Sequence, residues 1–348
     1  MNTNKIRLSV LDQSPVRKGV TAEQAVKETV ELAKYTDQLG YTRFWVSEHH
    51  NAGSLAGSTP EVLLAYLGSQ TKNIRLGSGG VMMPNHSALK VAENFRMLEA
   101  LFPGRIDLGM GRAPGTDRLT AAMLNPSNQF REQDFIEQLY DLRNYFHDTG
   151  ELGTPQAKIR AIPQVQTVPA MWLLSSSGQS GTFAAHFGMG FSFAHFINPV
   201  GGPAAVTAYR ERFQPSDDMH EQQANMAIFV FCSEDEEKIK QHQALMDFRF
   251  NQFEKGGSLT PVGYEDIKHV NYSAYEQERI LINRKRVVTG NPEQIKQKLT
   301  RLADDYNVDE IIAVTITEDF EDRLASYKLL AEIFNLKRYE IKGAGVEA

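Results

Sequence analysis

Glu48, His49 and His50 form a polar triplet directly after the apolar run Arg43–Val46. Titratable side chains at the end of a buried strand indicate a site that opens to a ligand, and histidine ionises near neutral pH. We therefore expect acid–base chemistry or a polar contact to a bound cofactor or substrate. The alternatives are a helix cap or a pair of surface histidines. A zinc site is disfavoured, because adjacent strand residues point to opposite faces and no H-x-x-x-H spacing occurs.

Glycine-rich segments end two further apolar runs. The first is Gly77-Ser78-Gly79-Gly80 and the second is Gly109-Met110-Gly111-Arg112. Glycines within a strand mark a β-bulge or the close approach of a flat ligand, and both interpretations of Gly79 and Gly80 stay open. The guanidinium of Arg112 suits a phosphate or a carboxylate, with a surface ion pair as the alternative. The spacing does not complete a dinucleotide-binding fingerprint, because no third glycine opens a helix.

A serine-rich segment, Ser175-Ser176-Ser177-Gly178-Gln179-Ser180-Gly181, follows another apolar run and leads into a predicted helix. Hydroxyl groups and free backbone amides at a helix N-terminus bind anions. We expect a phosphate monoester here, with ordinary N-capping as the alternative. The Gly-Lys-Ser/Thr ending of a P-loop is absent. The residues expected to contact the phosphate are Ser176, Ser177, Gly178 and Ser180.

Two other polar features have less specific interpretations. His195 and Phe196 follow the predicted strand 190–193 and wall the pocket, unless His195 is a packed structural histidine. The basic cluster Arg284-Lys285-Arg286 is typical of a solvated face, but in a mobile loop it would attract an anionic cofactor or substrate.

The bulk composition limits the class of protein. The chain has 348 residues, which suits a barrel of about 250 residues with insertions. Its net charge is −6 and it has no basic stripe, so we expect no nucleic-acid partner. Cys232 is the single cysteine, which excludes an internal disulfide and a cysteine-based metal cage. The sequence shows no signal peptide and no apolar run of about 18 residues, so we expect a cytoplasmic protein without a membrane partner.

Short apolar runs alternate with helix-period runs, which is the pattern of repeated βα units around a parallel sheet. We predict one domain over residues 1–348 with an α/β fold, a (β/α)8 TIM barrel with loop insertions. The longest insertion is an excursion at about 254–288, where glycines, prolines and scattered tyrosines break the alternation. Predicted strands occupy residues 8–12, 43–46, 75–79, 105–109, 170–174, 190–193, 225–232 and 310–315. Predicted helices occupy 21–39, 88–101, 129–146, 178–187, 199–213, 234–253 and 321–334, and two more begin at Pro60 and Pro292.

In these segments the chain resembles the bacterial luciferase-like family of flavin-dependent monooxygenases. The resemblance covers nearly the whole chain and rests on four blocks in order at predicted strand ends. Each block is weak alone, but four of them in this order are specific. They read FWVSEHH at 44–50, GSGGV at 77–81, GRIDLGMGR at 104–112 and TGNPE at 289–293.

The resemblance implies a luciferase-like barrel that binds FMN at the carboxyl ends of its strands. Many members of the family receive the cofactor as FMNH2 from a separate NAD(P)H:flavin reductase. The reduced flavin reacts with O2 to give a C4a-peroxyflavin, which oxygenates a small organic substrate. We predict this activity for the chain, together with a homodimer that pairs through the second and third helices.

The resemblance also implies roles for individual residues. His49 would lie beside the flavin and hydrogen-bond the peroxide or move its protons, while Glu48 and His50 would line or brace the same mouth. Gly79-Gly80 would form the bulge under the isoalloxazine ring, which in this family often contains a non-prolyl cis peptide bond. The excursion 254–288 matches a loop that covers the site. The phosphate-binding positions of the family are matched by Arg112, Ser176, Ser177 and Ser180.

Some features leave other functions open. Glycine occupies position 111, where luciferase α-subunits carry cysteine, so we do not predict light emission. One alternative is hydride transfer with a deazaflavin, whose acidic tail would need cations such as Arg112 and the 284–286 cluster. A second is a flavin-binding protein without oxygenase activity. A third, an unrelated barrel hydrolase, is disfavoured because paired acidic strand ends and a metal-ligand set are absent.

Overall fold

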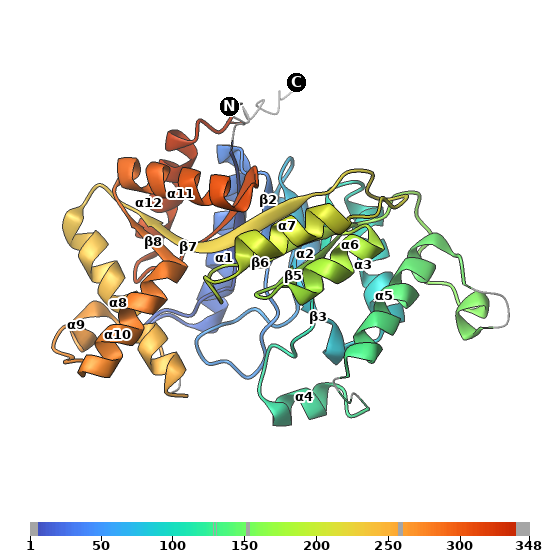
Figure 1. Ribbon diagram of the computed structural model, residues 1–348, viewed down its shortest axis with the longest axis horizontal. Coiled ribbons are helices and arrows are strands. Elements are labelled where there is room, and N and C mark those ends of the chain that lie inside the picture. The colour runs from blue at the N-terminus through green and yellow to red at the C-terminus, as the bar shows by residue number, and fades with distance from the viewer. Residues whose placement is uncertain (1–5, 128, 130, 151–153, 257–259, 339–348) are drawn as a thin grey trace, which may run out of the picture.

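Eight parallel strands close into a barrel in the computed structural model, which describes residues 6–127, 129, 131–150, 154–256 and 260–338 (Figure 1). Around the barrel the strand order is β1, β2, β3, β4, β5, β6, β7, β9, and β9 pairs with β1 to complete the circle. The predicted barrel fold is confirmed, and each of its eight strands lies within three residues of its predicted ends. The strands are β1 (Arg7–Asp12), β2 (Arg43–Val46), β3 (Arg75–Met82), β4 (Ile106–Gly111), β5 (Ala170–Ser175), β6 (Gly190–Ala194), β7 (Ala224–Cys232) and β9 (Glu310–Val314).

A ninth strand, β8 (Val287–Gly290), lies where the sequence predicts an excursion up to residue 288. The first half of β7 pairs with β6, ending at the pair Ala194 and Ala227, and β7 then continues beyond the end of β6. β8 pairs with this second half, starting with Val287 opposite Phe229. An exposed strand edge needs a partner, and β8 covers this one. The sequence prediction was wrong here because the apolar pair in β8 is too short to signal a strand.

Helices surround the barrel on its outer face, as Figure 1 shows. Local signals placed several ends correctly. The Thr21 side chain caps the first helix, Gly40 ends it with a φ of 85°, and Asn291 caps the helix that begins at Pro292. The main helices are α1 (Ala22–Leu39), α2 (Pro60–Gln70), α3 (Ala88–Leu101), α5 (Glu132–His147), α6 (Gln179–Phe187), α7 (Gly202–Arg212), α8 (Glu236–Glu254), α11 (Pro292–Tyr306) and α12 (Phe320–Ile333).

Two insertions flank the carboxyl ends of the strands, at the bottom of the view in Figure 1. One carries the short helix α4 (Arg118–Leu124), and the other carries α9 (Tyr264–Ile267), α10 (Ala274–Asn283) and the 3-10 turn η3 (Arg284–Arg286). The excursion is therefore more ordered than its sequence predicted, although its residues 257–259 lie outside the described residues. The helix predicted from residue 129 begins at Glu132, and Phe130 lies outside the described residues as well. Two further 3-10 turns are η1 (Met83–Asn85) and η2 (Pro155–Lys158).

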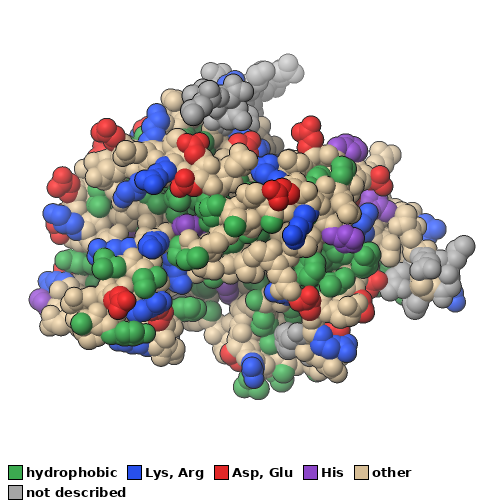
Figure 2. All heavy atoms as spheres, viewed as in Figure 1, with side chains coloured by type: hydrophobic (Ala, Val, Ile, Leu, Met, Phe, Trp, Pro, Cys, Tyr) green, Lys and Arg blue, Asp and Glu red, His purple; other side chains and the backbone are tan. Residues whose placement is uncertain are grey.

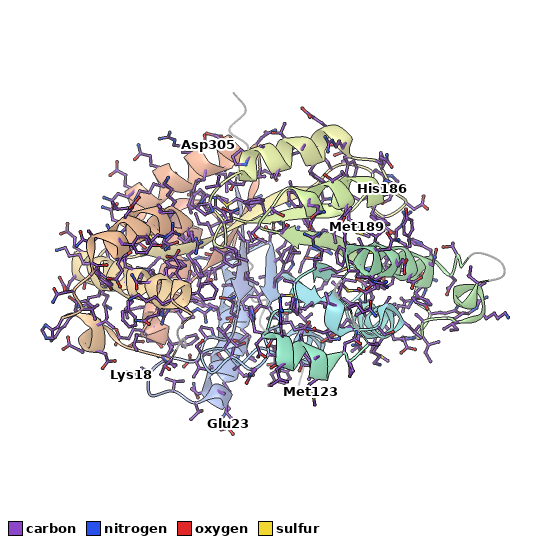
Figure 3. All side chains as sticks on the ribbon, turned by 60° about the horizontal axis from the view of Figure 1, so that its bottom comes forward. Lys18, Glu23, Met123, His186, Met189 and Asp305 are labelled. Atoms are coloured by element: carbon purple, nitrogen blue, oxygen red, sulfur yellow. The ribbon has the colours of Figure 1, made fainter. Side chains whose placement is uncertain are left out.

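The insertions form opposite sides of the barrel mouth. Figure 2 shows a notch in the surface between the α8–α10 region and the region around α4. In Figure 3, where the bottom of Figure 1 is turned forward, Met123 of α4 and Lys18 lie on opposite sides of this end. Lys18 Nζ pairs with Asp266 of α9 at 2.6 Å, which ties the loop after β1 to the second insertion.

The barrel interior has a charged base beneath an apolar layer. Arg43 pairs with Asp107 at 2.7 Å and with Glu310 at 2.6 Å, and all three side chains are buried. Asp107 also accepts a hydrogen bond from Trp45 Nε1 at 2.9 Å. The Arg43 guanidinium lies 4.7 Å from the centre of the Trp172 ring. These contacts hold the indole rings in place under the mouth of the barrel.

Candidate active site

A cavity of about 250 Å³ lies at the carboxyl ends of the strands. Its wall is largely apolar on the barrel side, where glycine backbone takes the place of side chains on β3 and β4. Hydroxyl groups and one guanidinium gather at the β5 and α6 side. The apolar lining residues are Leu11, Trp45, Met82, Ala113, Leu174, Ala194, Phe196, Ile197, Ala227 and Ile312. The other lining residues are Gly79, Gly80, Gly111, Arg112, Ser175, Ser176, Ser177, Ser180 and Ser192.

Gly79 and Gly80 line the cavity and are joined by a cis peptide bond. The pairing of β3 with β4 shifts register between Gly79 and Val81, so the bulge predicted at the glycines is present. A Cβ on Gly80 would lie 2.8 Å from the carbonyl oxygen of Gly109, and one on Gly79 would lie 2.7 Å from a methyl group of Leu11. Packing against backbone therefore requires glycine at position 80, whereas at position 79 the nearest atom is a methyl group that can move.

Most of the residues predicted to bind phosphate line the cavity, and they lie directly after β4 and in the β5–α6 segment. Ser176, Ser177 and Ser180 line it, and Gly178 occupies the N-cap position of α6 without lining it. No side chain caps this helix. Arg112 also lines the cavity and pairs with Glu132 of α5 at 3.2 Å, so the ion-pair interpretation is seen and its binding to a phosphate stays a prediction.

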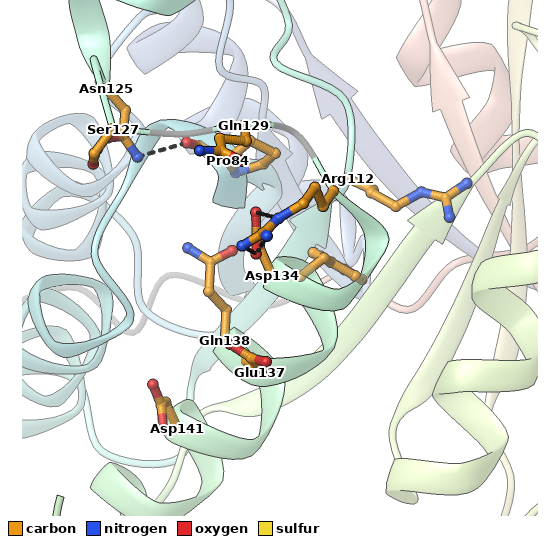
Figure 4. Close-up of a pocket in the computed structure, with 11 residues that line it drawn as sticks. Pro84, Arg112, Asn125, Ser127, Gln129, Asp134, Glu137, Gln138 and Asp141 are labelled. Atoms are coloured by element: carbon orange, nitrogen blue, oxygen red, sulfur yellow. Dashed lines mark hydrogen bonds and ion pairs between the residues drawn. The ribbon is translucent and has the colours of Figure 1, made fainter. Parts of the chain in front are cut away.

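A second cavity of about 310 Å³ lies beside α5 and shares Arg112 with the first (Figure 4). Its other charged residues are mainly acidic: Asp134, Glu137 and Asp141 face a single further cation, Arg131. Arg131 pairs with Asp134 at 2.6 Å. The space beyond Arg112 is therefore lined by an excess of carboxylate groups.

Glu48 is fully buried and its carboxylate joins three segments of the chain. Oε1 accepts hydrogen bonds from Nε2 of His50 and of His86, both at 2.8 Å, and Oε2 accepts one from the backbone N–H of Met82 at 2.8 Å. Burial opposes ionisation, but the hydrogen bonds and the nearby His86 hold the pKa of Glu48 below its ordinary value. Burial likewise opposes charge on His86, yet Glu48 raises the pKa of that imidazole. Glu48 therefore acts as an anionic link between the ends of β2 and β3.

His49 lies next to this cluster with different partners. Its Nε2 is 3.3 Å from Nε2 of Gln13, and its backbone N–H donates to the carbonyl of Gly57 at 2.9 Å. Burial lowers the pKa of His49, although a hydrogen bond to the Gly115 backbone and the charge of Glu48 oppose the shift. The neutral imidazole is therefore favoured, and a neutral ring can accept a proton.

The predicted triplet does not line the 250 Å³ cavity, whereas most of the predicted cofactor residues do. Glu48 acts on the cavity indirectly. Its carboxylate accepts a hydrogen bond from the backbone N–H of Met82, and the side chain of Met82 lines the cavity. Sequence analysis missed His86 and Gln13, the partners of Glu48 and His49. Gln13 follows β1 directly, so its place at a strand end was a usable signal, but His86 follows a 3-10 turn and carried none.

His195 is a structural histidine in this fold. Its Nδ1 is 2.7 Å from the hydroxyl of Tyr306, and its Nε2 is 2.8 Å from the carbonyl oxygen of Lys285. Because a carbonyl can only accept, Nε2 carries the proton and Nδ1 accepts from the tyrosine. The adjacent Phe196 does line the cavity, as predicted.

The chain matches the profile of the luciferase-like monooxygenase family over residues 6–307, and it belongs to that family. The family is one of flavin-dependent monooxygenases, and the chain is an enzyme of this class. It is similar to the uncharacterized protein YwcH of Bacillus subtilis (strain 168), with 47% identity over 94% of this chain and 99% of YwcH. It is also similar to the N-acetyl-S-alkylcysteine monooxygenase of the same organism, with 37% identity over 94% of this chain and 98% of that protein.

Solved structures show the same fold. The structure of apo-MsnO8 has a TM-score of 0.85 and 34% identity, covering 97% of this chain and 99% of MsnO8. More distant structures share the barrel but bind different cofactors. The oxygenating constituent of a diketocamphane monooxygenase from Pseudomonas putida, 17% identical, was solved with FMN, and a secondary alcohol dehydrogenase, 12% identical, depends on F420. At these identities the likeness extends to the fold alone.

Neither a metal-ligand group nor a membrane-spanning helix occurs among the described residues. No group of three or more His, Cys, Asp or Glu side chains within them is arranged to hold a metal ion. None of the helices described here has the length and apolar character needed to span a bilayer.

Proposed function

We propose that the chain is an FMNH2-dependent monooxygenase that inserts one atom of O2 into a small organic substrate. The observation that carries this proposal is the lining of the cavity, which combines apolar side chains and glycine backbone with serines of the β5–α6 segment and the guanidinium of Arg112. An isoalloxazine ring suits the part walled by Trp45, Gly79 and Gly80, and a phosphate monoester suits the serines and Arg112. The donor set therefore fits FMN.

The protein's own residues hold and shield the cofactor in this proposal. Reduced flavin, when bound, supplies two electrons, so that one oxygen atom enters the substrate and the other leaves as water. Ser176, Ser177 and Arg112 bind the phosphate, with the N-terminus of α6 behind them. The apolar wall excludes water from the reacting centre. His49, which lies outside the cavity lining, rests as the neutral imidazole oriented by Gln13, becomes cationic when it accepts a proton at its ring nitrogen, and is neutral again when it returns that proton.

FMN is favoured over a deazaflavin by the charge around Arg112. A deazaflavin with an acidic tail would extend past the phosphate site, and the adjoining cavity presents Asp134, Glu137 and Asp141. These three carboxylates outnumber the one further cation of that cavity, Arg131, which is already paired with Asp134, so the cavity disfavours binding of a polyanion. Titration of the chain with FMNH2 and with reduced deazaflavin under anaerobic conditions separates the two. Tighter binding of the deazaflavin would contradict the proposal.

The relative named N-acetyl-S-alkylcysteine monooxygenase suggests thioethers as the first substrates to assay. Oxygenation of a thioether gives a sulfoxide, and isotopically labelled O2 would place one labelled atom in it. We expect this product only when the chain is supplied with reduced flavin. A reaction in which reduced flavin is consumed and O2 yields only hydrogen peroxide with every thioether would remove this substrate class.

We further propose that a separate NAD(P)H:flavin reductase supplies the reduced cofactor. The chain lacks a complete dinucleotide-binding fingerprint after its fourth strand, which supports this division of labour. The purified chain should therefore not oxidise NADH or NADPH in the presence of FMN, and addition of any flavin reductase should start turnover. Rapid oxidation of NADH by the chain alone would show that it reduces its own flavin.

A homodimer that pairs through α2 and α3 is part of the same proposal. Large apolar side chains are exposed on both helices, namely Val62 (69%), Tyr66 (54%), Met97 (51%) and Leu101 (55%). Adjacent helices that expose such residues offer a self-complementary patch. Light scattering after size exclusion should give twice the chain mass for the wild type. A double substitution, Val62→Glu with Leu101→Glu, should give a monomer.

A further inference from the structure

Arg286 is a cation without an acidic partner in a segment where its neighbours are paired. Arg279 pairs with Glu254 at 2.7 Å, and Arg284 pairs with Asp247 at 2.7 Å. Among the described residues Arg286 forms no ion pair, and its buried Nε atom has no hydrogen-bond partner. A buried donor without an acceptor is costly, so a group that can accept this hydrogen bond is expected to bind there.

Aromatic rings connect Arg286 to the cavity. Its guanidinium lies 5.3 Å from the centre of the Phe250 ring. Phe250 packs against Phe229 at 5.9 Å between ring centres, and Phe229 packs against Phe196 at 5.3 Å. Phe196 lines the 250 Å³ cavity, and the rings of Phe196, Phe229 and Phe250, here called the aromatic wall, lead by successive contacts from that cavity to the guanidinium, although neither Phe229 nor Phe250 lines the cavity itself.

Rigid elements fix the backbone of Arg286 in this position. The preceding residue, Lys285, accepts a hydrogen bond from His195 through its carbonyl oxygen at 2.8 Å. The following residue, Val287, begins β8 and lies opposite Phe229 of β7. Burial lowers the pKa of His195, so the neutral ring keeps its proton on the nitrogen that faces Lys285. Groups held by strands and by such a tether are preorganised for binding.

We propose that Arg286 binds the carboxylate of the substrate, whose apolar part lies along the aromatic wall toward the reacting centre. This inference rests on the proposed monooxygenase function and defines its substrate class as a small anion with one apolar arm. A guanidinium binds a carboxylate through two parallel hydrogen bonds, and its partial burial reduces competition from water. Glu254 lies close enough to favour the charged form of Arg286, but the two form no ion pair, and the Glu254 carboxylate accepts its hydrogen bonds from Arg279 and Asn283.

The test compares a carboxylate with its isosteric amide. Binding of N-acetyl-S-methylcysteine and of its carboxamide to the full chain is measured by calorimetry, with and without FMN. We expect the wild type to bind the acid at least about tenfold more tightly than the amide, as for one charge-assisted pair. Arg286→Gln should abolish this preference by weakening the acid only, and Arg286→Lys should restore part of it. Lys285→Gln is the matched control, because it removes the adjacent exposed charge, and it should leave the preference unchanged.

Three results would overturn the inference: equal affinity for acid and amide in the wild type, the same preference in Arg286→Gln, or no binding of either ligand. A loss of FMN affinity in Arg286→Gln, with the preference intact, would also overturn it by assigning Arg286 to the cofactor. Failure of the proposed function gives a different pattern. If the acid binds preferentially but is not oxygenated, the monooxygenase proposal is wrong and the anion site at Arg286 stands. If acid and amide are oxygenated equally, the monooxygenase proposal stands and the anion site is wrong.

Discussion

Replacement of Glu48 by glutamine tests whether one buried carboxylate organises the ends of β2 and β3. The substitution preserves the shape of the side chain and removes its charge and one of its two acceptor oxygens. In the native chain those oxygens accept hydrogen bonds from His50, His86, Asn85 and the backbone of Met82. The amide group of glutamine must therefore face at least one donor.

The magnitude follows from these partners. If the amide faces Met82, a buried backbone N–H loses its acceptor, which costs about 1–3 kcal/mol. The bonds from His50 and His86 lose the assistance of a charge, at about 1 kcal/mol each. The total is about 3–5 kcal/mol of destabilisation. Glu31→Gln is the control, because Glu31 is exposed and pairs only with Lys34 one turn away, and it should cost less than about 0.5 kcal/mol.

The effect should depend on pH in a defined direction. The folded pKa of Glu48 lies below its ordinary value of 4.5, so its contribution is present above that pH and is lost as the pH falls through the folded pKa. The folded pKa of His86 lies above 6.5, so its contribution is complete below 6.5 and is lost as the pH rises through the folded pKa. The difference in the free energy of unfolding between the wild type and Glu48→Gln should therefore be largest between pH 4.5 and pH 6.5 and should become smaller in alkaline buffer.

Thermal unfolding of the wild type, Glu48→Gln and Glu31→Gln, followed by circular dichroism across this pH range, measures the effect. The melting temperature of Glu48→Gln should fall well below that of Glu31→Gln in mildly acidic buffer. An unchanged melting temperature would show that the histidines do not depend on Glu48. A large gap that stays constant into alkaline buffer would refute the coupling between Glu48 and His86.

Three further predictions concern the barrel base, the bulge and the phosphate end. Asp107→Asn breaks the buried contacts with Arg43 and should lower the free energy of unfolding by about 3–5 kcal/mol in denaturant titration; a loss below about 1 kcal/mol would contradict the role of this charged base. Gly80→Ala would place a Cβ 2.8 Å from the Gly109 oxygen, so thermal unfolding and FMN titration should show lower stability and weaker binding; unchanged values for both would refute the packing argument. Arg112→Met should weaken FMN about tenfold to a hundredfold in fluorescence titration and leave riboflavin unaffected, whereas an equal effect on both would place Arg112 away from the phosphate.

Sequence alone determined the barrel and placed most of the predicted cofactor residues at its cavity. Apolar runs of four to nine residues mark the buried strands, because a strand covered on both faces must be apolar along its length. Once the strands are known, a parallel barrel brings their carboxyl ends together, which places Gly79, Gly80, Arg112 and Ser176 around one cavity. Helix caps such as Asn291 could also be predicted from the sequence, because their hydrogen-bond partners lie within a few residues along the chain.

The tertiary structure decided every feature whose partner is distant in sequence. β8 pairs with the part of β7 that extends beyond the end of β6, and no local sequence pattern predicts this difference in strand length. His86 joins Glu48 across 38 residues, and Lys285 meets His195 across 90, so the roles of these residues depend on how strands and loops meet. Arg286 illustrates the same limit. The sequence shows a basic cluster, but only packing shows that Arg284 is paired with a carboxylate and that Arg286 forms no ion pair among the described residues.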